Sequence, residues 1–500
     1  MELIVALNRL KNLLLKNRMD QHFSHKLNEF ESLLNTVENP DDSVFCKILY
    51  NKSGLTKTYM SLKYRMEERL MNDVFKLSSD EENLKTRISA NIVVEKMMFI
   101  ASLLQKNFFR KEAIILYNKC FSLSIKFNFF NQALQAGQAL SNHYGFVEVN
   151  EKKMNYFLLK NNEFIEILAA ENYIKECNTI ISNLYVTNKG GLNSAQLNQI
   201  EEMVQKMTDF KTKFKTNTIV ILTNDLTFFY FQSIGDHIKA LHLALSALEE
   251  SKNLNNVDLR GLFQSKMNIG TSYFHLKKFE EASIWINEAS DILTEGSRNW
   301  FYAKSLLYLN LVLQRQYNSV LKLTLEVLSN KSLSKYPYFQ EQWAIREAYM
   351  YFLLRAGKIE CSEEEKKLLK PFVLSKFLNS VAFHSKDKSG QNITIIVLQI
   401  LFLLSDKKYD QIIDRIDALT QYSYRYLRND DTFRSNCFIK MLIQMGTANF
   451  HPIRTKTYTE DLRKKLNKSH FNTDEKSTQV EIIPYDYLWD VILEMLAKNK

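Results

Sequence analysis

The chain has 500 residues, of which only 12 are Gly and 5 are Pro, against averages of about 7% and 5%. Because these two residues punctuate sheets and long loops, their scarcity predicts a mostly helical protein. The net charge of +10 is small for this length and predicts solubility rather than nucleic-acid binding. Hydrophobic residues make up 45% of the chain, which excludes disorder over most of it.

Residues 1–80 are predicted to form an N-terminal helical cap or a small separate module. The segment 39–42 reads Asn-Pro-Asp-Asp, a break followed by residues that begin helices. After it, residues 58–77 predict an amphipathic helix with a shared apolar side: Tyr59, Leu62, Met66, Leu70 and Val74. A DNA-reading helix is the alternative, but Glu67, Glu68 and Asp73 would lie close to phosphates and repel them.

Residues 81–384 predict a run of paired helices. One helix begins near Ala90 and ends in a turn at Asn107, and the next is lined by Ala113, Leu116, Tyr117 and Cys120. A further pair is expected over 130–144 and 152–169, followed by a separate helix over 170–186. The Gly-rich segment 188–194 predicts a loop whose Ser194 caps a helix over 196–214.

The stretch 261–295 carries the most specific pattern in the chain. Small and aromatic residues recur there at spacings that place them on facing sides of two helices: Gly270, Tyr273, Phe279, Ala282, Ile286 and Ala289. A turn at Gly235 and Asp236, followed by Ala240, Ala244 and Ala247, gives a weaker echo. The pattern resembles the tetratricopeptide repeat (TPR). That resemblance implies an all-α, TPR-like α-solenoid with helical N- and C-terminal caps, because one such unit cannot bury its apolar face alone.

The resemblance also implies where a partner would bind. In this family the first helix of each pair lines a concave groove, so the helix around Gly270 is expected to expose Gln264, Met267, Asn268, Thr271, Phe274 and His275. We take Gln264, Asn268, Thr271 and His275 as candidate partner-binding residues. The next first helix carries Tyr302, Ser305, Leu306 and Leu309. It lacks the Lys and Arg with which a subset of the family grips a C-terminal carboxylate.

A further pair is expected over 340–357 and 362–379, and the repeat pattern is lost after Pro371. Residues 385–500 predict a C-terminal helical capping region. It contains a nearly all-apolar helix over 393–404 and an amphipathic one over 409–428, with Ile412, Ile413, Ile416, Leu419 and Tyr422 inward. A strand-like start at 480–483 precedes a last helix that reaches Leu496.

Two basic segments in this region are secondary candidates for a partner site. Arg425 and Arg428 alternate with tyrosines, and Arg463 and Lys464 belong to a basic stretch over 451–470. Such segments form a solvated helix face in one interpretation and contact an anionic partner in the other.

The sequence contains no motif for catalysis, a cofactor or a metal. His22 and His25 lack further ligands, and HExxH, CxxC, GxSxG and P-loop patterns do not occur. The five cysteines are unpaired in pattern and predict a reducing compartment. The N-terminus does not read as a secretory signal, and the apolar run 393–404 is shorter than the roughly 20 residues that span a bilayer. We therefore expect a cytoplasmic protein without a membrane span that is not an enzyme.

These observations favour a protein–protein interaction scaffold or adaptor that binds a peptide or helix of a partner in the solenoid groove. The alternative is a TPR-type regulatory protein that couples ligand binding to nucleic-acid or effector binding, through 58–77 or 451–470.

Overall fold

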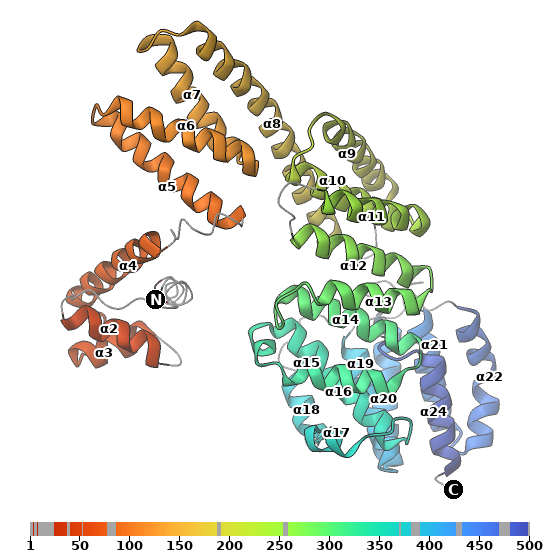
Figure 1. Cartoon of the computed structure of the whole chain (residues 1–500). Coiled ribbons are helices and arrows are strands. Elements are labelled where there is room, and N and C mark those ends of the chain that lie inside the picture. Colours follow the sequence, from red (N-terminus) through yellow and green to blue (C-terminus); the bar gives the residue numbers. More distant parts are fainter. Residues whose placement is uncertain are drawn as a thin grey trace. The chain divides into compact units, whose positions relative to one another are not determined.

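The computed structural model describes Ile4, Asn8 and residues 25–37, 41–52, 54–77, 87–187, 192–253, 259–369, 372–381, 391–426, 433–469 and 481–498. Every regular element within these ranges is a helix (Figure 1), as the scarcity of Gly and Pro predicts. The chain divides into two compact units, Met1–Asn172 and Tyr173–Lys500. The division of the sequence at 80 and 384 stays a prediction.

The first unit begins with three helices around a small core of their own. They are α2 (His25–Thr36), α3 (Asp42–Tyr50) and α4 (Lys57–Leu77). Asp41 begins α3 as its N-cap, because its carboxylate accepts a hydrogen bond from the Ser43 backbone N–H at 3.1 Å. Of the predicted apolar side of α4, Tyr59, Leu62, Met66 and Leu70 are buried, whereas the side chain of Val74 is outside the described residues.

The same unit contains α5 (Arg87–Lys106), α6 (Arg110–Phe127), α7 (Phe130–Phe146) and the start of α8 (Glu151–Thr187). The predicted turn at Asn107 is confirmed, and Ala113, Tyr117 and Cys120 are buried. The predicted break between Ala169 and Ala170 is wrong, because α8 is one helix of 37 residues. Its sequence contains neither Gly nor Pro, and two alanines favour helix more than any other pair would.

The second unit continues with alternating helices: α9 (Ser194–Lys213), α10 (Asn217–Ser233), α11 (His237–Lys252), α12 (Leu259–His275), α13 (Phe279–Ser290), α14 (Arg298–Leu313), α15 (Tyr317–Ser329), the 3-10 turn η2 (Lys331–Lys335) and α16 (Pro337–Arg355). Each of these helices from α9 to α16 packs on the next along the chain. The cap of α9 is Asn193 rather than the predicted Ser194, since Asn193 accepts from the Gln196 backbone N–H and Gln196 bonds back.

The predicted contact between α12 and α13 is confirmed. A Cβ added to Gly270 would lie 2.8 Å from Ile286 Cγ1 and 3.5 Å from the Ala282 carbonyl oxygen. Ala282, Ile286 and Ala289 are all buried. The turn at Gly235 is present as well, with φ at +77°, a conformation that favours glycine.

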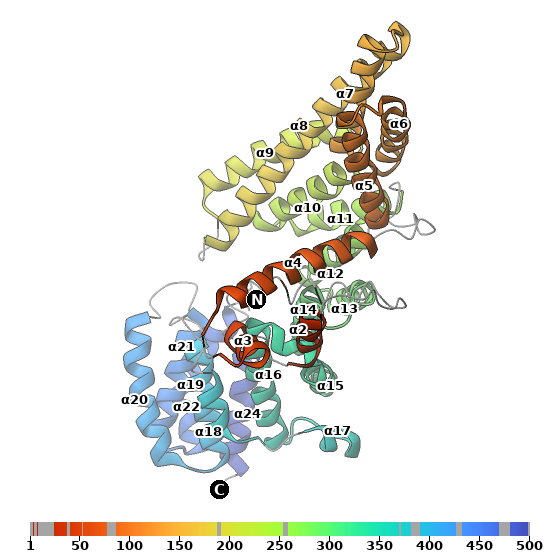
Figure 2. The same cartoon turned by 90° about the vertical axis from the view of Figure 1, so that its left-hand side faces the viewer.

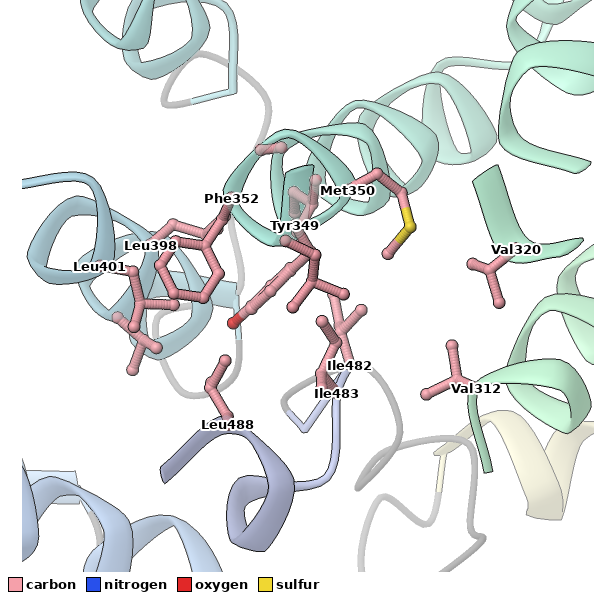
Figure 3. Close-up of a cluster of buried hydrophobic side chains, with 14 of the residues drawn as sticks. Val312, Val320, Tyr349, Met350, Phe352, Leu398, Leu401, Ile482, Ile483 and Leu488 are labelled. Atoms are coloured by element: carbon pink, nitrogen blue, oxygen red, sulfur yellow. The ribbon is translucent and has the colours of Figure 1, made fainter. Parts of the chain in front are cut away.

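The C-terminal part of this unit shares one core with the helix pairs. It comprises α17 (Glu363–Leu368), α18 (Leu374–Val381), α19 (Gln391–Ser405), α20 (Tyr409–Tyr426), α21 (Phe433–Thr447), α22 (Pro452–Lys468) and α24 (Tyr485–Lys498). The last helices lie side by side (Figure 2), with α21 packed on α20, α22 and α24. Tyr349 and Phe352 of α16 meet Leu398 and Leu401 of α19 together with Ile482 and Ile483 (Figure 3).

Three predictions in this region are wrong. Residues 362–379 form two helices instead of one, because Pro371 lacks an N–H and disfavours helix in the residue before it. The strand-like residues 481–483 form no strand: Ile482 and Ile483 lie in a bend and are buried, and no strand pairs with them among the described residues. Ile413 of α20 is 46% exposed, whereas Ile412 and Ile416 are buried as expected.

Candidate binding face

The first helices of the pairs in the second unit are α10, α12, α14 and α16. We align these helices on Phe228 in α10, Gly270 in α12, Tyr308 in α14 and Ala348 in α16. Two residues before these positions lie Asn268 in α12, Leu306 in α14 and Arg346 in α16. Three residues before them lie Asp225 in α10, Met267 in α12 and Ser305 in α14. We call the side of these helices that carries these positions the first-helix face.

The four predicted residues of α12 lie close together on one side of that helix. Gln264, Thr271 and His275 are partly exposed, whereas Asn268 is only 6% exposed. The Gln264 amide donates a hydrogen bond to Asn268 Oδ1 at 3.0 Å. The His275 ring stacks on the His237 ring with centroids 4.6 Å apart. The first contact joins Gln264 to Asn268 within α12, and the second joins His275 to α11.

The expected exposure of Met267, Asn268 and Phe274 is wrong, since Met267 is 3% and Phe274 1% exposed. Both apolar side chains belong to the core that includes Trp300 and Leu307 of α14. Phe274 also meets the Phe279 ring edge-on, with centroids 6.0 Å apart. Less of α12 is therefore open than the repeat pattern alone predicts.

Asp225 of α10 is an acidic residue that the sequence did not single out. Asn268 Nδ2 donates a hydrogen bond to Asp225 Oδ1 at 3.3 Å. Among the described residues no cation pairs with this carboxylate, and burial raises the pKa of Asp225 to about 7. Asp225 is thus poised to change its charge near neutral pH.

Arg346 of α16 is the basic counterpart of Asp225, and the sequence patterns did not single it out either. Its Nη1 donates a hydrogen bond to Ser305 Oγ at 2.8 Å. Its guanidinium lies 4.8 Å from the ring centroid of Tyr308 and 4.6 Å from that of Trp343. No carboxylate within the described ranges pairs with Arg346, and burial lowers its pKa to about 10.

Two more donors accompany this guanidinium. The buried Tyr308 hydroxyl and Trp343 Nε1 have no hydrogen-bond partner in the part of the chain that the structure describes. Burial without a partner costs free energy for such groups. The cluster of Arg346, Tyr308 and Trp343 is therefore rich in donors and poor in acceptors.

The two polar pairs occupy equivalent places in two seams between first helices. Asp225 and Asn268 are 43 residues apart, and Ser305 and Arg346 are 41 residues apart. At the equivalent positions, α12 carries Met267 and α14 carries Leu306. The sequence offers a signal for Asp225, which is the one charged residue of α10, but none for Arg346, which Glu347 follows directly. That each charge lacks an opposite charge depends on contacts between residues more than 40 positions apart.

The remaining predicted residues lie elsewhere. Arg428 is outside the described residues, and so is the side chain of Arg425 on α20. Arg463 of α22 pairs with Asp490 of α24, and Lys464 pairs with Glu460 one turn earlier. These contacts place the predicted basic pair against neighbouring carboxylates and do not bring it to the first-helix face.

No known family model matches the chain, and no curated protein is significantly similar to it. Among the described helices none combines the length and apolar composition that crossing a bilayer requires.

Proposed function

We propose that the chain is a TPR-like helical-repeat scaffold in the cytoplasm that binds a peptide segment of a partner on the first-helix face. The observation that carries the proposal is the pair of half-buried charges, Asp225 and Arg346, without opposite charges on the same face among the described residues. An intramolecular role in stability does not account for them, because a buried charge without a partner costs free energy. A ligand with opposite charges would compensate both.

The polar residues of α12 support the same site. Gln264, Thr271 and His275 are partly exposed, lie between the two charges in chain order, and carry hydrogen-bonding side chains. The five cysteines are all free, which fits a reducing compartment.

The proposal is tested by comparing three variants of the full chain in affinity capture from the native cell, with quantitative mass spectrometry. A face variant carries Gln264→Ala, Thr271→Ala and His275→Ala. A matched control carries Glu280→Ala, Glu281→Ala and Ile284→Ala on the exposed side of the partner helix α13. A third variant carries Arg463→Gln and Lys464→Gln on α22.

We expect the face variant to lose the captured partner and the α13 control to keep it. All three should remain folded, since substitutions of exposed and half-buried polar residues cost about 0.5 kcal/mol each or less. Capture by the face variant equal to that of the control would contradict the proposal. Loss in the α22 variant alone would place the partner site on the basic helix instead.

A further inference from the structure

The three most exposed large apolar side chains of the described residues all lie at two turns of the first unit. Phe108 is 82% exposed, Phe146 84% and Val149 83%, whereas no other such side chain within the described ranges exceeds 69%. Phe108 belongs to the turn between α5 and α6, and Phe146 and Val149 lie at the turn between α7 and α8. Side chains this exposed gain almost no packing energy from their own chain, so folding does not account for them.

The backbone at Phe108 does not require an aromatic side chain. Its N–H donates a hydrogen bond to the Gln105 carbonyl oxygen at 3.2 Å, and the turn holds Phe108 at φ +67°. Gly and Asn adopt this left-handed conformation most easily. The other described non-glycine residues with positive φ are Asn, Lys or Arg, apart from Phe450, whose ring stacks on that of Tyr409. Phe108 is thus an apolar residue at a place where the other turns carry polar residues or glycine.

The two turns lie at the same end of their helices. Helices α5 to α8 run in alternating directions (Figure 1). A cavity of about 660 Å³ lies between the turns and is lined from both sides, by Lys106 and Arg110 at the first turn and by Phe146 and Val147 at the second. The exposed apolar side chains of the two turns therefore form one surface, which we call the apolar tip: Phe108, Phe109, Phe146, Val147 and Val149.

Basic side chains surround the apolar tip. Lys106, Arg110 and Lys111 precede and follow the first turn, and all three are exposed. None of them pairs with a carboxylate in the part of the chain that the structure describes. Two of them, Lys106 and Arg110, also line the cavity, where Asn142 and His143 add further polar groups.

The carboxylates near the tip are engaged within the protein. Glu148 lies 3.4 Å from His143 Nε2 and 4.0 Å from Lys153 Nζ. Glu112 and Glu151 stand in the first turns of α6 and α8, where a negative charge stabilises the start of a helix. The free charges at the mouth of the cavity are therefore positive, and their complement is an anionic surface.

We propose that the apolar tip docks the protein on an anionic lipid surface. Phe108, Phe146 and Val149 enter the layer where headgroups meet acyl chains, and Lys106 and Arg110 hold lipid phosphates at the mouth of the cavity. Apolar side chains ringed by cations match such a surface. A protein partner would need a hollow shaped for each protruding side chain, whereas lipid yields to any shape. The inference concerns the first unit and does not depend on the peptide site proposed above.

The test measures co-sedimentation of the full chain with two kinds of vesicle, one of phosphatidylcholine alone and one of phosphatidylcholine mixed with phosphatidylserine. We expect binding to the mixed vesicles and little binding to phosphatidylcholine alone. Added salt should weaken the binding, because it screens exposed charges. Equal binding to both kinds of vesicle would contradict the assigned role of the cations.

Two variants separate the apolar and the charged contributions. An apolar variant carries Phe108→Asn, Phe146→Ser and Val149→Ser, and it should bind the mixed vesicles at least about tenfold more weakly. Its melting temperature should not fall, since Asn suits the left-handed turn and the other two side chains are exposed. A cation variant carries Lys106→Gln, Arg110→Gln and Lys111→Gln, and it should lose most of the preference for phosphatidylserine.

The matched control removes exposed apolar side chains outside the tip. It carries Ile238→Ser, Leu259→Ser and Ile453→Ser, whose side chains are 60%, 62% and 69% exposed, and it should bind as the unchanged protein does. Phe146→Trp reports directly on contact with lipid. Its fluorescence should shift to shorter wavelength on the mixed vesicles, whereas that of Ile453→Trp on α22 should not.

Three results would overturn the inference. The unchanged protein fails to sediment with the mixed vesicles, or the apolar variant binds them as well as the control does. In the third, the unchanged protein is a dimer in solution and the apolar variant a monomer, so that a second copy of the chain rather than lipid covers the tip. Sedimentation velocity on both proteins distinguishes this last case.

Discussion

At the scale of single residues, Asp225 couples the stability of the second unit to pH. Burial raises the pKa of Asp225 to about 7 from an ordinary value of 3.8. Between these two pH values the folded protein therefore keeps a proton on Asp225 that the unfolded chain has released. The charged groups facing this part of α10, Lys211 and Glu250, pair with each other and bond to the neighbouring Asn224. They do not supply a counter-charge to Asp225.

The free energy of unfolding should therefore fall as pH rises from about 4 to 7. Above pH 7 the contribution of Asp225 should fall no further. Between pH 5 and 7 the loss is on the order of 2 kcal/mol, because one pKa unit corresponds to about 1.4 kcal/mol. Asp225→Asn removes the titrating group, so this variant should be more stable than the unchanged protein at pH 8 and nearly equal to it at pH 4.5. Urea unfolding at the two pH values measures the difference in free energy of unfolding between the variant and the unchanged protein. The same difference at both pH values would show that the pKa of Asp225 is not raised.

Gly270 gives a second prediction at this scale. An added methyl group would lie 2.8 Å from Ile286 Cγ1 and 3.3 Å from the Ile286 backbone nitrogen. Gly270→Ala and Ala282→Leu should each cost roughly 1–3 kcal/mol by overpacking the contact between α12 and α13. Gly54→Ala is the control, since its Cβ would meet nothing within 4 Å. Thermal unfolding of the three variants distinguishes them, and an unchanged melting temperature for Ala282→Leu would contradict this helix contact.

At the scale of elements, one ion pair ties α21 to the start of the last helix. Arg434 donates hydrogen bonds to both oxygens of the Glu481 carboxylate at 2.7 and 2.8 Å and to the carbonyl oxygens of Leu466 and Ser469. Glu481 also accepts from the Tyr485 backbone N–H at 2.7 Å. Burial raises the pKa of Glu481, and Arg434 opposes that rise.

Arg434→Met should destabilise the second unit by about 3–5 kcal/mol, since it leaves a buried carboxylate without its partner. The double variant Arg434→Met with Glu481→Leu should recover much of that loss, because it removes the orphaned charge. Chemical unfolding of both variants at pH 7 tests this. A double variant no more stable than the single one would show that packing rather than charge holds these helices together.

At the scale of the whole molecule, the core that includes α16, α19 and α24 does not end where the repeat pattern ends. Residues on both sides of 385 contribute to it, among them Tyr349, Leu398 and Ile483 (Figure 3). The three helices α2 to α4, by contrast, bury Phe30, Phe45 and Tyr59 in a separate cluster.

A chain that ends at residue 385 should therefore lose cooperative unfolding and expose apolar surface to a fluorescent dye, because α16 would lack its cover. A chain that begins at residue 87 should keep the main unfolding transition within a few degrees. Calorimetry on the two shortened proteins separates these cases. A sharp transition retained by the chain that ends at 385 would show that the helix pairs are stable without the C-terminal helices.

The sequence predicted what depends on local spacing. Gly270, Ala282 and Ile286 follow a helical period on two neighbouring helices, so their contact follows from the spacing of small residues alone. It did not predict α8 as one helix, because a run without helix breakers contains no signal for how far it continues. Nor did it predict Asp225 and Arg346 as site residues, because the lack of an opposite charge is a property of three-dimensional neighbours.

The buried cysteines have a practical consequence. Cys46 lies in α3, Cys120 in α6, Cys177 in α8 and Cys437 in α21, and all four side chains are buried. Burial raises the pKa of Cys120 to about 12 and also raises those of Cys177 and Cys437, so little reactive thiolate forms at these three residues while their helices stay closed. Alkylation at each thiol therefore reports how often its own helix opens. The natural chain thus contains probes of local opening in four helices, without any label introduced by mutation.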